Sequence, residues 1–389
     1  MQRTIRFLVA FLALAFIVFG SYLAINYAKG YRPSLATKTF EGTGLLAANS
    51  IPKGASVFIN NKLTSATDDT LNLPPGEYQI KIAKDGYIPW EKTLVLEPEL
   101  VTETNARLFP SVPNLKPLTS SGAINPLPSP DGQKILFSVN NATNNAKNGL
   151  YILDLLDRPL ALNSQPRQIS RLVNGDFSWS PDSSQILVSQ PDSNFFLNSN
   201  SLNDLANIKD VTAQLPLIKK QWAEDLNKKQ KEQIKLLPEF MQNLATSSAS
   251  LISFSPDELK MLYLATQSAQ IPENLIPPLP ASSTQLQARQ IKPGNYYVYD
   301  LEEDRNFLIA PYQENIPILW YPDSRHLITI EDSKIIILEY DATNRAVIYA
   351  GPFADNFVFP WPNGSQLIIL ASLNGGSNLP PNLYSINLK

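Results

Sequence analysis

One histidine and no cysteine limit the chemistry that this chain can perform. The 389 residues include a single histidine, His326, and no cysteine. Ser-His-Asp catalysis needs a histidine beside its nucleophile, and zinc sites need several His or Cys ligands. His326 lies in a repeated turn-and-strand pattern, in which other repeats have Lys134, Ile186, Met261 or Ile368 nearby. We therefore interpret it as a turn residue and not as a general base.

Local catalytic motifs supply no candidate either. The chain has no Gly-x-Ser-x-Gly elbow, phosphate-binding loop or dinucleotide fingerprint. The acidic run Glu302-Glu303-Asp304 lacks the spacing of a calcium loop, and we interpret it as a solvated turn between strands. The sequence therefore assigns no catalytic, cofactor-binding, metal-ligating or other ligand-binding residue, and we expect no cofactor and no enzymatic activity.

Carboxylate pairs keep one enzymatic alternative open. Glycosidase carboxylates have no local signature, so a carbohydrate-active hydrolase or lyase remains a second hypothesis for this chain.

The charge of the chain argues against a nucleic-acid-binding protein. Lys and Arg number 32, Asp and Glu number 35, and the formal net charge is -3. A nucleic-acid-binding protein would show a basic domain or stripe, so we expect no nucleic-acid partner.

Tyr87 and Trp90 are the aromatic candidates for a binding role. An exposed pair could stack on a sugar ring. The alternative is that both complete the core of a very small domain, which needs large side chains to bury enough area. We favour the second interpretation.

The amino-terminal segment predicts a membrane helix over residues 1–30. The uncharged run from Phe7 to Ala28 has about the 20 residues that a spanning helix needs. A cleaved signal peptide would have a shorter apolar region and a small-residue cleavage site, so a retained anchor is favoured. The flanking positive charges are nearly balanced and do not fix the orientation. A polar linker is expected over residues 31–44.

Residues 45–110 alternate apolar and polar side chains, as half-buried strands do. Turn-forming residues separate these short runs. The segments PKGA (52–55), VFINNK (57–62), LNLPPGEYQIKI (71–82) and KDGYIPW (84–90) together resemble a PEGA domain. The family's usual Gly-x-Thr-Pro turn is replaced here by residues 65–68. The resemblance implies a small antiparallel β-sandwich of a cell-surface or envelope protein, with a role in contacts and no catalytic residue.

A repeated motif occupies the rest of the chain, residues 111–389. In each copy a proline is followed by Asp or Asn, a turn and an apolar strand. The shortest spacing, from Pro322 to Pro362, matches the ~40 residues of a propeller blade. Aromatic side chains two residues before the proline are suited to wedge between blades. The prolines are Pro130, Pro181, Pro256, Pro322 and Pro362, and the aromatic residues are Trp179, Phe254 and Trp320.

These repeats resemble the WD-like repeats of TolB-type β-propellers. The resemblance implies about five blades, or six if one repeat is degenerate. Tyr321 and Asn363 depart from the usual Ser and Asp of the motif. We expect residues 115–119 to supply the fourth strand of the last blade and so close the ring. The predicted fold class is mainly β, with a transmembrane helix, a PEGA-like sandwich and a propeller.

Two insertions interrupt the repeats. Residues 198–248 are predicted to be helical, with Leu215, Ile218, Trp222 and Leu226 on one face. Pro216 fits the first turn of the first helix, and Pro238 fits the start of a second. We also expect Glu224–Lys228 and Asp225–Lys229 ion pairs on the exposed side. This arm either docks a partner or packs on its own blade. Residues 268–294, rich in Pro, Ser and Gln, are expected to form an extended loop over one propeller face.

The order of these parts predicts a single-pass protein of the bacterial cell membrane with most of the chain on the extracytoplasmic side. We expect a non-catalytic binding or scaffolding protein whose propeller presents a surface to an envelope protein or a cell-wall polymer. This expectation depends partly on family resemblance, because a fold does not set a function.

Overall fold

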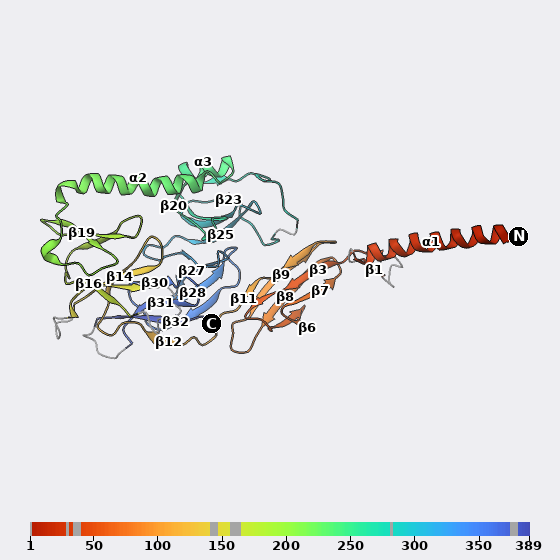
Figure 1. Ribbon diagram of the computed structural model, residues 1–389, viewed down its shortest axis with the longest axis horizontal. Coiled ribbons are helices and arrows are strands. Elements are labelled where there is room, and N and C mark those ends of the chain that lie inside the picture. Colours follow the sequence, from red (N-terminus) through yellow and green to blue (C-terminus); the bar gives the residue numbers. More distant parts are fainter. Residues whose placement is uncertain are drawn as a thin grey trace. The chain divides into compact units, whose positions relative to one another are not determined.

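The computed structural model describes residues 2–28, 31–33, 40–140, 147–155, 165–280, 283–373 and 380–389 (Figure 1). The chain divides into two units, which are described separately below. The first comprises Met1–Leu108 with Pro278–Leu286, and the second comprises Phe109–Pro277 with Gln287–Lys389. Residues 29–30 of the predicted membrane segment and residues 34–39 of the predicted linker lie outside the described residues.

The first unit begins with the long apolar helix α1, Gln2–Ala28. Within it, the 18 residues Ala10–Tyr27 have a mean hydropathy of 1.8, and none of them is buried against the protein. A helix pairs its own backbone groups, which is what a segment in hydrocarbon must do. In length and composition α1 therefore meets the requirements of the predicted membrane anchor.

A small β domain follows α1. Its strands form a sheet of order β6-β5-β8-β9, a sheet of order β10-β3-β7 and the pair β11-β4. The sides of these strands that face one another enclose a core that includes Val57, Ile80, Ile82, Trp90 and Leu94. The strands are β3 Gly44–Ala48, β4 Ser50–Ile51, β5 Ser56–Ile59, β6 Lys62–Ala66, β7 Asp69–Leu73, β8 Gly76–Ala83, β9 Trp90–Leu96, β10 Val101–Glu103 and β11 Ala106–Arg107; the short strands β1 Arg32–Pro33 and β2 Phe40–Glu41 pair before them.

This domain differs from the predicted sandwich in one respect. The pairs β5–β6, β5–β8, β8–β9 and β3–β7 are antiparallel, as expected. In contrast, β10 pairs with β3 and β11 pairs with β4 in parallel. The reason is that the chain after β9 returns along the same direction as β3 and β4, so its last strands cannot align antiparallel to them. The sandwich is therefore mixed.

Five sheets of three or four strands follow one another along the described part of the second unit, and we number them as blades 1 to 5. Each blade starts with one of the predicted repeats, so the Pro-Asp or Pro-Asn turn joins its first two strands. Blade 1 has β13 Ile124–Pro128, β14 Lys134–Val139, β15 Gly149–Asp154 and β16 Arg167–Ser170; blade 2 has β17 Asp176–Trp179, β18 Gln185–Ser189 and β19 Asn194–Asn198. Blade 3 has β20 Ala249–Phe254, β21 Lys260–Ala265, β24 Asn295–Asp300 and β25 Arg305–Pro311; blade 4 has β26 Leu319–Trp320, β27 His326–Glu331, β28 Lys334–Glu339 and β29 Ala346–Tyr349; blade 5 has β30 Val358–Pro360, β31 Gln366–Ala371, β32 Asn382–Asn387 and β12 Leu115–Pro117.

Blade 5 closes the ring with a strand from the start of the second unit, as predicted. The strand β12 lies at the edge of this blade, antiparallel to β32, with Leu115 opposite Ile386. Beyond β12, the Thr119 hydroxyl and the Gly122 N–H both donate to the Asn382 side-chain oxygen, at 2.9 and 3.0 Å. The two ends of this unit are thereby held in one sheet.

Neighbouring blades share apolar cores because strand side chains alternate between the two faces of a sheet. In blade 3, Leu262, Tyr296 and Val298 lie in a cluster with Trp320 and Leu338 of blade 4. Similar clusters join blade 1 to blade 2 and blade 1 to blade 5. Each sheet thus buries its two faces only because neighbouring blades pack against them, as in a propeller.

The predicted aromatic wedges are confirmed at two blades. The Trp179 indole N–H donates to the Leu127 carbonyl of blade 1 at 3.0 Å. The Trp320 indole N–H donates in the same way to the Ser253 carbonyl of blade 3 at 3.1 Å. Both side chains are only 8% exposed. Phe254 of blade 3 instead packs against a cluster formed with the inserted helices.

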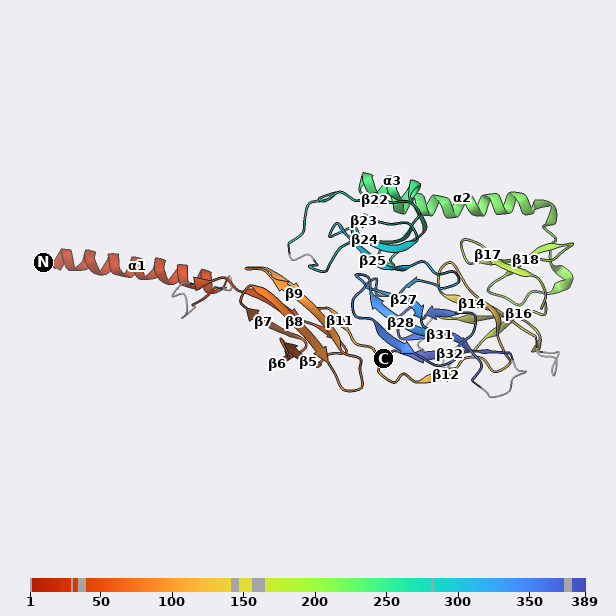
Figure 2. The same cartoon turned by 180° about the vertical axis from the view of Figure 1, so that it is seen from behind.

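Two helices lie between blades 2 and 3 in the chain. After the short turns η2 Leu205–Asn207 and η3 Thr212–Gln214, α2 covers Leu215–Ile234 and α3 covers Glu239–Ser247. Figures 1 and 2 show α2 running from the side of blade 2 toward α3 and blade 3. The predicted positions of Pro216 and Pro238, at the starts of the two helices, are confirmed.

The helices cover the faces that blades 2 and 3 would otherwise leave bare. Met241 and Leu244 of α3 are buried in one cluster with Met261, Tyr263 and Tyr297 of blade 3. On blade 2, Phe196 packs against Trp222 of α2, with ring centroids 5.8 Å apart. Blade 2 has three strands, and its outer edge is extended by a single bridge from Phe195 to Asp210.

The Pro-rich insertion divides between the two units. Its ends pair as the ribbon β22 Ala269–Gln270 and β23 Gln290–Ile291 beside blade 3. Residues Pro278–Leu286 belong instead to the first unit, where the Gln285 side-chain amide donates to the Thr93 carbonyl at 2.8 Å. The expectation of a loop lying wholly over a propeller face is therefore wrong for this part, because edge strand β9 offers it a backbone acceptor.

Candidate functional site

The repeated Pro-Asp turns are held together by their own polar side chains. In blade 2, the Ser180 hydroxyl donates to the Asp182 carboxylate at 2.6 Å and accepts from the Gln185 N–H at 2.9 Å. The Ser184 N–H donates to the same carboxylate at 3.1 Å. Ser183, between them, has a φ of 60°, the left-handed conformation that closes the turn. Ser129–Asp131 and Ser255–Asp257 repeat the hydroxyl-to-carboxylate bond in blades 1 and 3.

The turns also bind one another around the ring. The Asp131 N–H of blade 1 donates to the Ser183 hydroxyl of blade 2 at 3.1 Å. The Asp257 N–H of blade 3 donates to the Ser324 hydroxyl of blade 4 at 3.0 Å. The polar groups that recur from blade to blade therefore serve the architecture, and their repetition does not mark a catalytic site.

The departure from the motif in blade 4 is accommodated by the glycine of the turn in blade 5. Tyr321 replaces the serine of blade 4, and its hydroxyl donates to the Gly364 carbonyl in the turn of blade 5. Gly364 has a φ of 66°, and a Cβ on it would come 2.9 Å from the Tyr321 hydroxyl oxygen. The larger side chain in one turn is thus accommodated by glycine in the next.

His326 is the first residue of β27, directly after the turn of blade 4, and not in the turn itself. Its ring Nδ1 lies 2.9 Å from the Asp323 carboxylate, and its backbone N–H donates to the same side chain at 3.1 Å. The side chain is 3% exposed. The rings of Phe109 and Tyr321 approach it edge-on, with centroids 5.5 and 6.2 Å away. His326 is thus packed in the interior beside the chain that enters the second unit.

The acidic run Glu302-Glu303-Asp304 forms a turn, but the prediction that it is solvated is wrong for Asp304. That residue is 4% exposed. Its carboxylate accepts from the Tyr299 hydroxyl and from the Leu275 N–H, both at 2.9 Å, and pairs with Arg289 at 3.2 Å. Leu275 and Arg289 belong to the Pro-rich insertion, which folds back and covers the turn. Burial and the bond to Asp304 also raise the pKa of Tyr299.

Carboxyl pKa values give no support to acid catalysis. Hydrogen bonds from Ser180 and Ser184 lower the pKa of Asp182. The pKa values of Asp68, Asp210 and Glu232 are likewise lowered, chiefly by side-chain hydrogen bonds. A general acid at neutral pH needs a raised pKa. The described residues also contain no cluster of three or more side chains suited to hold a metal ion.

The aromatic candidates of the small domain belong mainly to its core. Trp90 is 2% exposed and lies in the core cluster of this domain. Tyr87 is half-buried and packs against the same cluster. Trp90 therefore has no free face on which a sugar could stack, and the core interpretation is confirmed for it.

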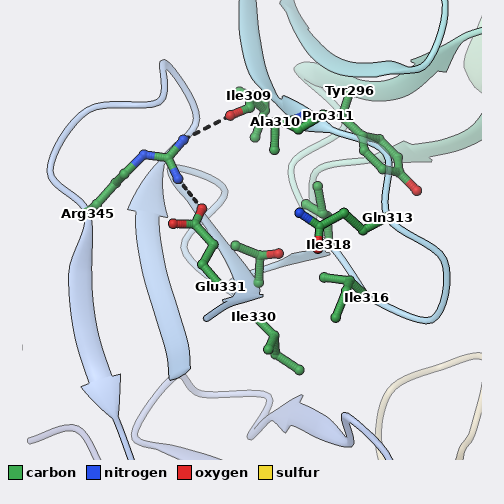
Figure 3. A pocket seen from close by; sticks show the side chains of 11 residues that line it. Tyr296, Ile309, Ala310, Pro311, Gln313, Ile316, Ile318, Ile330, Glu331 and Arg345 are labelled. Atoms are coloured by element: carbon green, nitrogen blue, oxygen red, sulfur yellow. Dashed lines mark hydrogen bonds and ion pairs between the residues drawn. The ribbon is translucent and has the colours of Figure 1, made fainter. Parts of the chain in front are cut away.

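Besides a hollow of about 330 Å³ lined by residues of blades 1 and 5, a small cavity lies between blades 3 and 4 (Figure 3). Its volume is about 140 Å³, and isoleucines such as Ile309, Ile316 and Ile330 line it. Arg345 borders it, donating to the Glu331 carboxylate and to the Ile309 carbonyl, the latter at 2.9 Å. Ligand pockets usually measure about 300–1,000 Å³. We therefore interpret this space as a seam between two blades, tied by Arg345.

The exposed surface of α2 is the feature that the architecture does not use. None of its residues is fully buried, and Leu215, Ile218 and Trp222 are half-buried. Leu226, predicted to share that apolar face, is 52% exposed. Glu224 pairs with Lys220, at 3.9 Å, and not with Lys228 as expected. The predicted Asp225–Lys229 pair does not form in the structure.

Sequence reasoning missed the outward face of α2. The pattern search followed apolar residues and opposite-charge pairs, whereas this face is recognised by lysines spaced three, four or eight residues apart. These are Lys220, Lys228, Lys231 and Lys235, all exposed. That spacing is visible in the sequence and would have indicated the surface.

Comparison of the chain with solved structures finds distant similarities. A TolB structure from Agrobacterium tumefaciens is 15% identical, with 68% of this chain and 78% of that chain covered and a TM-score of 0.22. TolB from Acinetobacter baumannii is 13% identical, with 81% and 61% covered and a TM-score of 0.23. An oligogalacturonate lyase in complex with manganese is 10% identical, with 80% and 74% covered and a TM-score of 0.23. TM-scores this low do not establish a shared fold. The propeller assignment therefore depends on the five blades and the apolar cores that they share.

Comparison by sequence identifies one domain. No curated protein matches the chain. Residues 43–111 match the PEGA domain family, and they coincide with the mixed β-sandwich of the first unit. The motifs quoted above lie within this range. Residues 43–111 of this chain are therefore a PEGA domain.

Proposed function

We propose that this chain is a non-catalytic, membrane-anchored binding protein of the cell envelope. In this proposal α1 stays in the membrane, and the PEGA domain and the propeller lie on the extracytoplasmic side. The propeller presents a surface to an envelope protein or a cell-wall polymer. One observation carries the proposal: the recurring Ser, Asp and aromatic residues of the blades are bonded internally, while the polar side chains of α2 remain exposed.

A capture experiment tests this proposal. Full-length protein in detergent micelles is incubated with isolated cell-wall polymer and, separately, with cross-linker and detergent-solubilised envelope proteins. We expect saturable retention on the wall polymer or a single cross-linked partner at a defined ratio. Retention in neither arm would contradict a binding role.

The alternative of a carbohydrate-active hydrolase or lyase has a distinct outcome. Such an enzyme would release soluble sugar fragments from the wall polymer in proportion to time and protein concentration. Our proposal expects no release above that of heat-treated protein.

A further inference from the structure

Four lysines form one exposed stripe along the outward side of α2 and the residue that follows it. An α-helix turns by about 100° per residue, so Lys220, Lys228, Lys231 and Lys235 fall within about 80° of one another. At a rise of about 1.5 Å per residue they extend over roughly 22 Å. The side chains of Lys220 and Lys235 are 74% and 65% exposed. We call these four residues the lysine stripe.

The opposite side of the helix is turned to the propeller. Trp222 and Lys231 are nine residues apart, which places them about 180° apart around the helix. Trp222 packs against Phe196 of blade 2. Near the other end, the Gln233 side-chain amide donates to Glu258 of blade 3 at 2.8 Å. These contacts hold α2 against blades 2 and 3. Lys220, Lys231 and Lys235 lie on the other side of the helix, and Lys228 borders a hollow that Glu258 of blade 3 also lines.

Positive charge is concentrated here within an acidic protein. The formal net charge of the chain is -3, whereas α2 has five lysines against three acidic residues, and Lys235 follows it directly. Two of the acidic side chains are paired, Glu224 with Lys220 and Glu232 with Lys235. Lys235 and, to a smaller extent, Lys228 lower the pKa of Glu232. The stripe therefore keeps a net positive charge at neutral pH.

The chemistry of the stripe selects one kind of occupant. All its cations are lysines, which act as point charges. An arginine would instead pair with one planar anionic group through two hydrogen bonds from its guanidinium. A straight row of point charges suits a linear polymer that carries regularly spaced anions. A bilayer surface would also require an apolar helix face to insert. Trp222 packs against blade 2, Ile218 is half-buried, and Leu217 is the exposed apolar side chain within the sector of the stripe. A single leucine does not make an apolar face.

We propose that the lysine stripe of α2 binds a linear, phosphate-bearing polyanion of the cell wall. This inference rests on the proposed function, because it names the polymer class that the propeller would hold. Binding is Coulombic, so it weakens as salt screens the charges.

The test uses full-length protein in detergent micelles and fluorescent long-chain inorganic polyphosphate, with binding followed by anisotropy. Two variants of equal charge change are compared. Lys228→Gln with Lys231→Gln removes two stripe charges. Lys219→Gln with Lys229→Gln removes two charges from the flanks of the propeller-facing side of the same helix. Glutamine and lysine have similar helix propensities, so both variants keep the helix.

We expect the stripe variant to bind polyphosphate roughly 10- to 25-fold more weakly, since an exposed ion pair is worth up to about 1 kcal/mol, or fivefold. The matched control should change less than about twofold. Equal losses in the two variants, or no loss in the stripe variant, would overturn the assignment to this face. Tighter binding of polyglutamate than of polyphosphate would overturn it in favour of an acidic peptide. Binding to vesicles rich in anionic lipid, without binding to polyphosphate, would overturn it in favour of a membrane surface.

A second readout separates this inference from the proposed function. The stripe variant and the wild type are sedimented with isolated cell-wall polymer. Loss of sedimentation in the stripe variant alone supports the lysine stripe. Equal sedimentation of the two proteins refutes the stripe and leaves the proposed binding function standing.

Discussion

Substitution by phenylalanine should lower the free energy of unfolding at Trp320 more than at Trp361, although both indoles are buried. Trp320 is 8% exposed, and its Nε1 donates to the Ser253 carbonyl at 3.1 Å. Trp361 is 6% exposed, and its Nε1 has no acceptor among the described residues. The substitution removes the same atoms at both positions. Only at Trp320 does it also break a hydrogen bond between two blades.

The difference between the two variants isolates that bond. Trp320→Phe removes the indole donor to the Ser253 carbonyl in the seam, and the net contribution of one such hydrogen bond is about 0.5–1.5 kcal/mol. Trp361→Phe removes a donor that is already unpaired, so its hydrogen-bond contribution is near zero or favourable. Both variants lose similar packing, which cancels in the comparison. For a domain of this size the difference corresponds to roughly 1–3 °C in the unfolding temperature.

Thermal and urea unfolding of the full-length protein in detergent, followed by circular dichroism of the β signal, measures this difference. We expect Trp320→Phe to unfold at the lower temperature and urea concentration. Equal destabilisation by the two substitutions would refute the reasoning, because it would show that packing alone accounts for the wedges. A larger effect at Trp361 would refute it as well.

Three further predictions address the turns and the entry to the propeller. Hydrogen bonds lower the pKa of Asp182 below the ordinary 3.8. The ionised Asp182 side chain therefore stabilises the folded protein above pH 3.8, and this stabilisation is lost as the pH falls through the pKa that Asp182 has in the folded state. Asp182→Asn should therefore be less stable than the wild type at pH 7, with the gap narrowing on acidification, as urea unfolding at each pH would measure; a gap independent of pH would contradict this. Gly364→Ala should lower the free energy of unfolding by at least about 1 kcal/mol, since alanine is strained at positive φ. In a double-mutant cycle, Tyr321→Phe should recover part of that loss. Additive effects of the two substitutions would exclude an energetic coupling between residues 321 and 364. Phe109→Ala should destabilise the second unit by about 3–5 kcal/mol, and a change below 1 kcal/mol in thermal unfolding would show that the ring contacts with Tyr321 and His326 do not matter.

The repeat pattern made most of the propeller predictable. Pro and Asp specify turns through their own backbone preferences, so the first hairpin of each blade could be placed from the sequence. The closing strand at residues 115–119 was predictable because the last blade lacked a fourth strand of its own. The parallel pairing of β10 with β3 was not predictable in the same way. Alternation of side chains reports which face a residue occupies but not the direction of the neighbouring strand.

Long-range contacts explain the remaining differences. Asp304 is buried because Arg289 and Leu275 reach it from an insertion whose local sequence indicates only an extended loop. Glu224 pairs with Lys220 and not with Lys228, although both lie four residues away. Short-range spacing predicts that a pair can form, whereas the choice between equal spacings depends on side-chain packing. The lysine stripe was visible in the sequence, but its exposure required the contacts of Trp222 with blade 2.

One time course tests the central claim, that the chain binds the cell envelope without catalysing a reaction on it. Full-length protein in detergent is mixed with isolated cell-wall polymer, and bound protein and released soluble sugar are measured in the same samples. Our account predicts saturable bound protein and a release of sugar equal to that of heat-treated protein at all times. Release of sugar that rises with time and protein concentration, or absence of bound protein here together with no cross-linked envelope partner, would contradict it.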